Sequence, residues 1–294
     1  MSHDIGQLIA RHCRDSLTPT AVPRLMLSRS DGPTALSPAI LTPLVCVVAS
    51  GRKRLFLGRD EYRYDPNTYL IASADLPVRS QVVVAPCLAL TLTIDPATVA
   101  ELLLDLPPRR AQLPSPALAV SPLDDDLANA VERLLRLLDH PADIPALAGL
   151  VEREIVYRLL CGPQGEMLRQ LARRSSQLAQ ISRAIGIIRA RFDEKIRVEE
   201  LARAADMSPT SFHRHFRRVT ALSPLQFQKR IRLHEARRAL LSRNVDATQV
   251  SLDVGYDSTS QFNREYRRLF GKPPGRDAAE ARRAAEGNAA AVVS

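Results

Sequence analysis

The sequence predicts a two-domain α+β protein, in which a small β-sandwich or barrel with flanking helices precedes an all-α domain with two helix-turn-helix units. Its 294 residues suit two average domains better than one. Strand-like runs fill residues 40–95, whereas helical periodicity fills the chain from residue 176 onward. The net charge of +9 divides the chain in the same way, because residues 175–294 contain 22 Lys and Arg against 13 Asp and Glu, and residues 1–174 contain 19 of each. A basic domain joined to a neutral one is typical of a protein whose basic part meets a polyanion.

The first part of the chain alternates between β-rich runs and turn residues. Residues 1–38 have no clear period, and we expect short strands or an arm there. Residues 44–48 predict a strand, and the Ser-Gly-Arg-Lys sequence at residues 50–53 predicts a hairpin turn after it. Residues 88–94 alternate between large apolar and small residues, as in a half-buried strand. Further strand-like runs are residues 54–57, 69–72 and 81–84, so a small sandwich or barrel is favoured.

Three helices are expected between the strands and the basic domain. They cover residues 96–104, 124–138 and 144–161, and the second opens with three aspartates, which are favourable at a helix N-terminus. These leucine-rich helices could pack on the strands or on a second subunit. The domain boundary is placed at residues 173–176. The expected segments are therefore residues 1–174, residues 176–276 and a tail at residues 277–294.

The basic domain contains an internal repeat. Ser208 suits a helix N-cap and Pro209 a first helical position, so a helix with a basic polar face should follow a short turn. Ser208, Phe212, Arg214, Phe216, Arg217, Arg218 and Pro224 recur fifty positions later as Ser258, Phe262, Arg264, Tyr266, Arg267, Arg268 and Pro274. The preceding helices match at an offset of 49, which predicts one more residue in the second turn, at residues 255–256. Ser258 and Gln261 predict a capping box.

Two aligned copies point to DNA more strongly than one helix-turn-helix pattern. The alternative for a single pair of arginines is a solvated helix face, but the repeat and the charge segregation together favour insertion into a major groove. A long helix is predicted between the copies, from residues 223–224 to about residue 241. Its cations are Lys229, Arg230, Arg232, Arg237 and Arg238.

At these residues the chain resembles the DNA-binding domain of AraC/XylS-type regulators. The most specific stretch is residues 253–258, followed by Gln261, Phe262, Arg264, residues 270–271 and Pro274. The resemblance implies a seven-helix domain whose two recognition helices enter successive major grooves of double-stranded DNA. One departure is the sequence Pro-Gly-Arg-Asp at residues 274–277, where the family often has Tyr-Arg shortly after the last proline.

Carried over by position, the resemblance assigns base contacts to both units. These are Thr210, His213 and Arg214 in the first unit, and Thr259, Ser260, Gln261, Asn263 and Arg264 in the second. The chemistry agrees, because arginine can contact guanine through two hydrogen bonds and Asn or Gln can do so with adenine. The arginines farther along each helix are expected to contact phosphates; they are Arg217, Arg218, Arg267 and Arg268.

The first part of the chain is similar to the cupin-like N-terminal domain of one AraC subgroup. This likeness is carried by Gly58, residues 62–64, 69–70, Ser73, residues 76–78 and 88–95. It implies a sensory and dimerising module that binds a small-molecule effector. The candidate effector-binding residues are Tyr62, Tyr64, Tyr69, Arg79 and Cys87. The alternatives are ordinary strand aromatics, a surface arginine and, for Cys46 and Cys87, small buried residues instead of electrophile or oxidant sensors.

No catalytic or metal-binding pattern is found, so neither an enzyme nor a cofactor is expected. The histidines of the first part are His3, His12 and His140, and none lies in the strand region. The four cysteines form no zinc or disulfide pattern. With no secretory signal and no membrane-spanning run, we expect a cytoplasmic protein whose partners are DNA, an effector, a second copy and RNA polymerase. The rival hypotheses are an architectural DNA-binding protein and an enzyme with an accessory DNA-binding domain.

Overall fold

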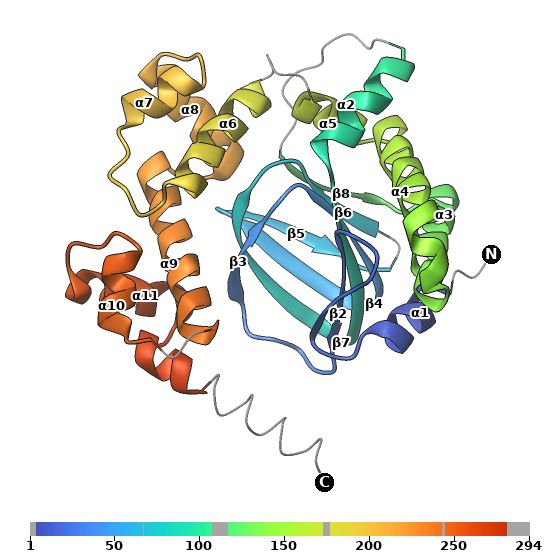
Figure 1. Ribbon diagram of the computed structural model, residues 1–294, viewed down its shortest axis with the longest axis horizontal. Coiled ribbons are helices and arrows are strands. Elements are labelled where there is room, and N and C mark those ends of the chain that lie inside the picture. Colours follow the sequence, from blue (N-terminus) through green and yellow to red (C-terminus); the bar gives the residue numbers. More distant parts are fainter. Residues whose placement is uncertain (1–3, 67, 108–116, 173–176, 243–244, 281–294) are drawn as a thin grey trace. The chain divides into compact units, whose positions relative to one another are not determined.

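The computed structural model describes residues 4–66, 68–107, 117–172, 177–242 and 245–280 (Figure 1). The chain forms two compact units, one of residues 1–182 with 218–221 and one of residues 183–217 with 222–294. The first contains a β-sheet with helices against it, and the second is helical. The expected two-domain α+β class is confirmed, while the expected boundary at residues 173–176 lies outside the described residues.

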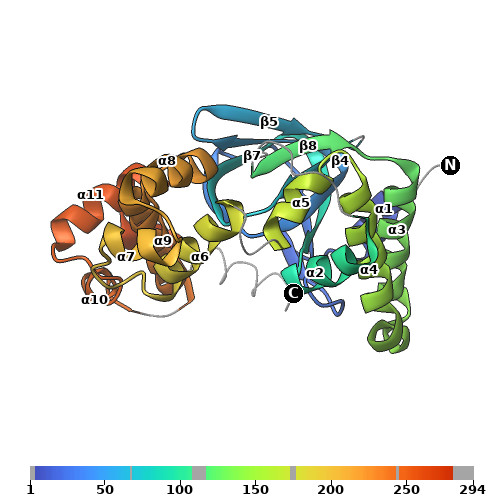
Figure 2. The same cartoon turned by 90° about the horizontal axis from the view of Figure 1, so that it is seen from above.

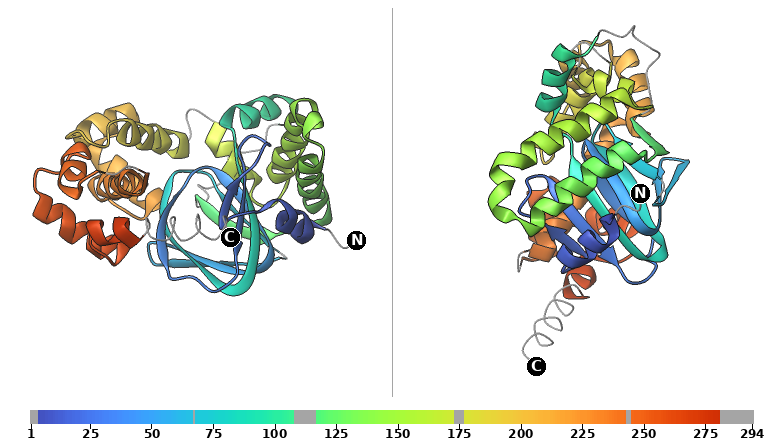
Figure 3. Two further views of the ribbon diagram at one scale, coloured as in Figure 1. Left: turned by 60° about the horizontal axis from the view of Figure 1, so that its bottom comes forward. Right: turned by 90° about the vertical axis from the view of Figure 1, so that its right-hand side faces the viewer.

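The first unit is built on one antiparallel sheet that has eight strands in the described part of the chain. They are β1 (Leu17–Pro19), β2 (Leu25–Ser30), β3 (Ser37–Leu41), β4 (Leu44–Leu57), β5 (Asp60–Tyr64), β6 (Thr68–Ala72), β7 (Leu76–Thr93) and β8 (Leu118–Pro122). The order is β1-β2-β7-β4-β6-β8, with β3 paired to β7 and β5 paired to β4. The long strands β4 and β7 have different neighbours along their two halves, so the sheet curls round on itself (Figure 3).

Strand β4 continues without a turn through residues 50–53, where the sequence predicts a hairpin. Its pairing with β7 shifts register three times between Val48 and Lys53. Gly51 lies there with φ of 76°, and a Cβ atom on it would be 2.4 Å from the Val84 carbonyl oxygen. The hairpin prediction is wrong because the small and polar residues that suit a turn also suit β-bulges, where a partner backbone approaches closely.

Helices cover one face of the sheet. They are α1 (Ile5–His12), α2 (Pro96–Asp105), α3 (Asp125–Arg136), α4 (Ile144–Cys161) and α5 (Gly165–Ala172), with short 3-10 turns η1 (Leu137–Asp139) and η2 (Pro141–Asp143) between α3 and α4. Val45 and Val47 of β4 share one core with α1, α3 and α4. The three expected helices α2, α3 and α4 are confirmed. The short strands expected within residues 1–38 are present as β1 and β2. Helix α1 precedes them and was not expected; its apolar side chains gather on one face and are buried against the sheet.

The second compact unit of the chain is built from helices. They are α6 (Gln177–Ala190), α7 (Val198–Ala204), α8 (Pro209–Thr220), α9 (Pro224–Ser242), α10 (Ala247–Asp253) and α11 (Thr259–Phe270), and residues 274–280 are also helical. The described residues thus contain the seven helices that the resemblance implies. Helix α9 runs between the α7–α8 pair and the α10–α11 pair (Figures 1 and 2).

Candidate nucleic-acid interface and cavity

The α7–α8 and α10–α11 pairs are two helix-turn-helix units with the same turn. In the first, the Met207 N–H donates to the Ala202 carbonyl at 2.9 Å, and in the second the Tyr256 N–H donates to the Ser251 carbonyl at 2.9 Å. These bonds lie 49 residues apart, so the expected offset is confirmed. The expected place of the additional residue, at residues 255–256, is wrong, because both of these residues have counterparts in the first turn. The additional residue is Asp257, which follows the shared turn and precedes the next helix.

Both units use left-handed backbone at the same two places. The second residue after the first helix of each pair is Asp206 with φ of 52° in one unit and Gly255 with φ of 82° in the other. The residue that ends each recognition helix is Ala221 with φ of 58° and Gly271 with φ of 80°. Glycine adopts this conformation without steric cost, so the first unit carries backbone strain that the second avoids.

Serine hydroxyls cap both recognition helices. The Ser208 hydroxyl accepts from the Ser211 N–H and the Ser258 hydroxyl from the Gln261 N–H, each at 3.3 Å. Only the hydroxyl half of the expected capping box is therefore present, because the Gln261 side-chain amide donates to Glu265 at 3.1 Å. A complete box stands instead at the start of α9, between Ser223 and Gln226.

One face of each recognition helix is buried by an aromatic pair. Phe212 and Phe216 have ring centroids 5.4 Å apart, and Phe262 and Tyr266 have centroids 5.6 Å apart. All four side chains are fully buried. Because these pairs fix which face points inward, the residues on the opposite face of α8 and α11 are exposed to solvent.

Most of the predicted base-contacting and phosphate-contacting residues are exposed on that outer face. They are Thr210, His213, Arg214, Arg217 and Arg218 on α8, and Ser260, Asn263, Arg264, Arg267 and Arg268 on α11. Thr259 and Gln261 are half-buried instead. The Thr259 hydroxyl lies 3.2 Å from the Ser251 hydroxyl, so both of these side chains have polar partners inside the domain.

A buried carboxylate organises the second unit. Glu265 accepts hydrogen bonds from Lys229 at 2.7 Å, from Tyr256 at 2.9 Å and from Gln261 at 3.1 Å. Burial raises the pKa of Glu265, but these three bonds and the Lys229 charge outweigh burial and hold the pKa below its ordinary value. Burial and the Glu265 bond raise the pKa of Tyr256.

The departure from the family pattern at residues 274–277 has a structural role. Asp277 is buried and accepts hydrogen bonds from Tyr266 at 2.9 Å and from Arg237 at 2.8 Å. Arg237 also lies over the Phe270 ring, with 4.8 Å to the centroid. Asp277 thus ties the last described helix to α11 and α9.

A cavity of about 770 Å³ opens beside α11. It is lined by Asn263, Arg264, Arg267 and Arg268, together with Ala247, Gly271 and residues 273–275. The hollow brings together two predicted base-contacting side chains and two predicted phosphate-contacting side chains.

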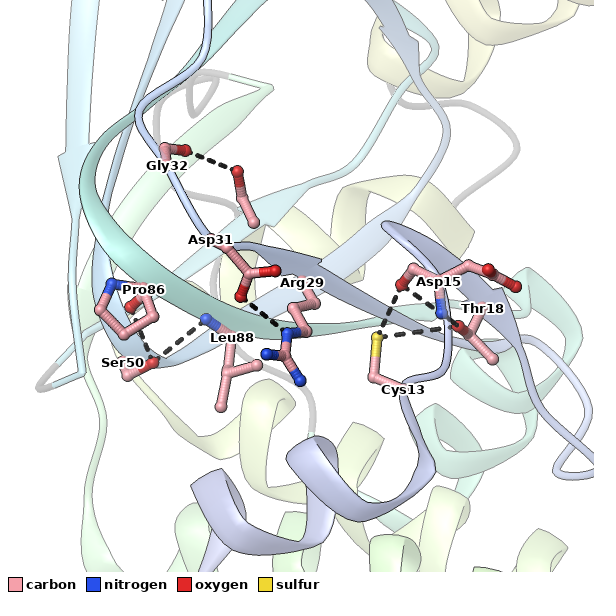
Figure 4. Close-up of polar contacts among 10 residues, drawn as sticks. Cys13, Asp15, Thr18, Arg29, Asp31, Gly32, Ser50, Pro86 and Leu88 are labelled. Carbon is pink, nitrogen blue, oxygen red and sulfur yellow. Dashed lines mark hydrogen bonds and ion pairs between the residues drawn. The ribbon is translucent and has the colours of Figure 1, made fainter. Parts of the chain in front are cut away.

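A smaller hollow of about 330 Å³ lies in the β-sheet of the N-terminal part of the chain. It is lined by Ser16, Ser28, Arg29, Ser30, Thr34, Ser37, Pro38, Ala39, Lys53, Ser80, Gln81, Val82 and Cys87. Two of the lining residues make hydrogen bonds to the loop after β2: the Arg29 guanidinium donates to Asp31 at 2.8 Å (Figure 4), and the Ser30 hydroxyl donates to the Gly32 carbonyl at 2.7 Å. The residues that line the hollow thus include several serines, the cationic residues Arg29 and Lys53, and the buried Cys87.

Two family models match the chain. The model of the AraC-type transcriptional regulator N-terminus matches residues 21–167, which is half of the chain, and a helix-turn-helix domain model matches residues 201–279. The chain belongs to the AraC family of transcriptional regulators. The resemblance that its sequence carries is thereby confirmed in both parts.

Curated relatives of this AraC-type chain agree with that assignment. It is 29% identical over 150 residues to the HTH-type transcriptional regulator ArgR of Pseudomonas aeruginosa, covering 50% of this chain and 45% of the relative. It is 29% identical over 162 residues to the regulator ExsA of the same organism, covering 54% of this chain and 56% of the relative. The chain thus spans about half the length of the curated relatives it matches.

Solved structures of ToxT from Vibrio cholerae share the fold. ToxT of strain O395 bound to (E)-4-(8-methylnaphthalen-1-yl)but-3-enoic acid has a TM-score of 0.61 and 10% identity, with 91% of this chain and 100% of that chain covered. Unsaturated fatty acid bound ToxT of strain SCE256 has a TM-score of 0.59 and 9% identity, with 87% of this chain and 93% of that chain covered. At these identities the likeness concerns the fold alone.

The predicted effector residues of this AraC-type chain are spread over the sheet domain. Cys87 lines the 330 Å³ hollow, and buried Tyr64 lies beside Cys46 and Cys87. Tyr69 is in the core under the helices. Tyr62 is half-buried on β5, and exposed Arg79 lies over the Phe56 ring with 5.5 Å to the centroid.

Two lining cations, Arg29 and Lys53, are not among the residues expected from the sequence. The available signal for a polar pocket is the pair Ser28 and Ser30 on β2, because small polar residues at every second position of a strand share one face. This pattern does not identify Arg29, which lies between them, or Lys53.

The thiols in this region are buried. Cys46 is 5% exposed and Cys87 is 3% exposed, and burial raises the pKa of Cys87 even though the Lys53 charge opposes the shift. A buried thiol with a raised pKa is poorly reactive. Among the described residues, no group of three His, Cys, Asp or Glu side chains is placed to hold a metal ion, and no helix is long and apolar enough to cross a membrane.

Proposed function

We propose that this AraC-family chain is a sequence-specific DNA-binding transcription regulator whose helices α8 and α11 enter two successive major grooves. One observation carries the proposal: a similar set of exposed polar and cationic residues occurs on both helices. The two sets lie fifty residues apart, and each follows a serine cap. Arg214 and Arg264 are equivalent residues of the two helices, and both are exposed in the first half of their helices. Early positions on a recognition helix are the ones that approach base edges.

The contacts divide by chemistry. Arg214 and Arg264 would contact guanine, and Asn263 would contact adenine, while Thr210, His213 and Ser260 lie beside them. Thr259 and Gln261 must first give up hydrogen bonds inside the domain, so they contribute less to base selection. The paired arginines at the ends of the two helices, Arg217, Arg218, Arg267 and Arg268, would contact phosphates.

Selection of bound sequences from random DNA tests this function. The full chain at near-physiological salt should select a motif with two boxes about one helical turn apart. DNA binding without any selected motif would favour the rival hypothesis of an architectural protein, which predicts steep salt dependence and little discrimination. No catalytic role is part of the proposal.

We propose the hollow in the sheet as the effector site. The ToxT structures name an unsaturated fatty acid and a butenoic acid, which are both carboxylic acids. Here Lys53 supplies a cation to a polar hollow, and the Arg29 guanidinium is already paired with Asp31. A small carboxylic acid bound to Lys53 would match this charge.

Ligand-dependent thermal stability tests the effector site. A panel of carboxylic acids should raise the melting temperature of the wild type and fail to do so for Lys53→Met. The matched control is Arg52→Met, because Arg52 is the neighbouring cation and does not line the hollow. Equal responses of both variants would exclude Lys53 as the anchor.

We propose that two copies pair through α4. Leu147, Leu150 and Tyr157 are exposed large side chains on this helix, and Cys161 is exposed four residues later. The intervals of three, seven and four residues fit a helix-pairing seam. The position missing from the series is Glu154, which is ion-paired with Arg133 and Arg158. Antiparallel pairing places Cys161 of one copy opposite Leu147 of the other, whereas parallel pairing brings the two thiols together.

Sedimentation and mild oxidation test the pairing. The wild type should sediment as a dimer, and Leu150→Glu should sediment as a monomer. A Cys161 crosslink under mild oxidation would identify the parallel arrangement. A monomeric wild type would reject the pairing.

We propose further that the DNA-bound regulator acts in the cytoplasm by contacting RNA polymerase. A reconstituted transcription assay with purified polymerase tests this step.

A further inference from the structure

Arg232 of α9 contacts both helix-turn-helix units at once. Its guanidinium donates to four backbone carbonyls. Three of them, on Phe192 at 2.6 Å, Asp193 at 3.1 Å and Glu194 at 2.8 Å, precede α7 of the first unit. The fourth, on Gly255 at 2.6 Å, lies in the turn of the second unit. One half-buried side chain therefore joins the entry of one unit to the turn of the other.

The contact suits the chemistry of arginine. Carbonyls at the end of a helix lack intrahelical partners, and those after α6 point at this guanidinium. Only the planar fork of arginine offers enough donors to satisfy four acceptors together. Arg232 is half-buried, and this burial lowers its pKa. Carbonyls left unpaired at such a partly dehydrated site would be costly.

The two units also touch directly at this point. A Cβ atom on Gly255 would lie 2.0 Å from the Asp193 carbonyl oxygen, so only glycine allows the approach. Gln228, one helical turn before Arg232, donates to the carbonyls of Phe192 at 3.0 Å and Glu194 at 2.7 Å. The Phe192 side chain packs against the core of the second unit.

We propose that Arg232 is a positioning residue that sets the spacing between the two DNA boxes. It holds the turn of the second unit against residues 192–194, which precede α7 of the first unit, and so fixes the separation and rotation of α8 and α11. One inserted base pair moves the second box by about 3.4 Å and by about a tenth of a turn. A rigid pair of units must lose contacts at the wrong spacing, whereas a loosened pair can follow the DNA. This inference rests on the proposed two-box recognition.

A distance measurement in the free protein tests, without DNA, whether Arg232 holds the two helix-turn-helix units in a fixed arrangement. Spin labels are placed at Arg203→Cys on α7 and Leu252→Cys on α10, two exposed positions, in a full chain whose exposed thiol is removed by Cys161→Ser. Pulsed dipolar spectroscopy should give one narrow distance with Arg232 present and a broad distribution with Arg232→Gln. An unchanged width in folded Arg232→Gln would overturn the proposal.

A spacer series tests the consequence for DNA. The wild type should lose about tenfold in affinity when one base pair is inserted between the boxes, and Arg232→Gln should lose less than about threefold. The control Arg238→Gln removes the same charge from a position that is 78% exposed and paired with Glu235 on the same helix, so it should keep the wild-type spacer profile. Identical spacer profiles for all three proteins would contradict the clamp.

Two provisions keep the outcomes distinct. If Arg232→Gln does not fold, Gln228→Met removes two of the same carbonyl bonds with little change in volume, and it should flatten the spacer profile and broaden the distance less strongly. If the wild type selects no two-box motif, the proposed function fails, and the distance measurement alone then decides whether Arg232 holds the units together.

Discussion

The two helix-turn-helix units share one backbone design but are stabilised by different chemistry. In the first, Phe216 packs edge-on against Phe227 with centroids 5.5 Å apart, and the surrounding buried side chains are mainly aliphatic. In the second, the tyrosines Tyr256 and Tyr266 each donate a hydrogen bond to a buried carboxylate. Aromatic packing responds gradually to substitution, whereas a hydrogen-bonded carboxylate leaves unsatisfied partners when it is removed.

The largest expected effect is on the carboxylate of the second unit. Glu265→Leu leaves the Tyr256 hydroxyl and the Gln261 amide without their acceptor, so the unfolding free energy should fall by about 2–3 kcal/mol. Urea denaturation of the full chain measures the loss. Asp257→Leu removes an exposed carboxylate of the same unit and should cost less than about 0.5 kcal/mol. Equal losses would show that the buried network adds nothing.

The two helix-turn-helix units should also differ in which DNA box their arginines recognise. Arg214→Ala and Arg264→Ala should each weaken binding to the selected site by about 1–3 kcal/mol and relax the sequence preference of one box only. Repeating the sequence selection with each variant measures this. If either variant blurred both boxes, the assignment of one box to each unit would be wrong.

Low pH should lower the folding stability of the second helix-turn-helix unit, because His234 resists protonation in the folded chain. Burial, with smaller contributions from Arg230 and Arg237, lowers the pKa of His234 from 6.5 to about 4. The unfolded chain then binds a proton that the folded chain refuses, so stability is complete above pH 6.5 and falls as the pH drops towards 4. The loss at pH 5 should be about 2 kcal/mol. Denaturation at pH 7 and pH 5 measures it, and a His234→Leu variant with the same pH dependence as the wild type would exclude this histidine.

The smallest expected effect concerns the left-handed residues that end the recognition helices. Ala221→Gly should stabilise the first unit by about 0.5 kcal/mol, because relief of the strained backbone slightly exceeds the added freedom of the unfolded chain. Gly271→Ala should have the opposite sign in the second unit. Thermal unfolding of both variants gives the comparison, and changes of the same sign would refute it.

Sequence patterns predicted the helical domain well because its signals are local. A serine cap, an aromatic pair four residues apart and two arginines define each recognition helix without reference to the rest of the chain. The extra residue in the second turn also followed from the two offsets, and the structure places it at Asp257.

Features that depend on tertiary contacts were less accessible. The hairpin prediction at residues 50–53 failed because a turn and a β-bulge use the same residues, and only the partner strand distinguishes them. Similarly, five cations on α9 indicate a basic face, yet Lys229, Arg232 and Arg237 turn inward to Glu265, backbone carbonyls and Asp277. Their acceptors lie 23 to 40 residues along the chain, where no local pattern connects them.

Hydroxyl-radical footprinting of the full chain on its selected site tests the central claim most directly. Two recognition helices held in fixed register should protect two patches on the same face of the duplex, about one helical turn apart. Arg214→Ala and Arg264→Ala should each weaken a different patch. A single protected patch, or two patches on opposite faces, would contradict recognition by two coupled helix-turn-helix units.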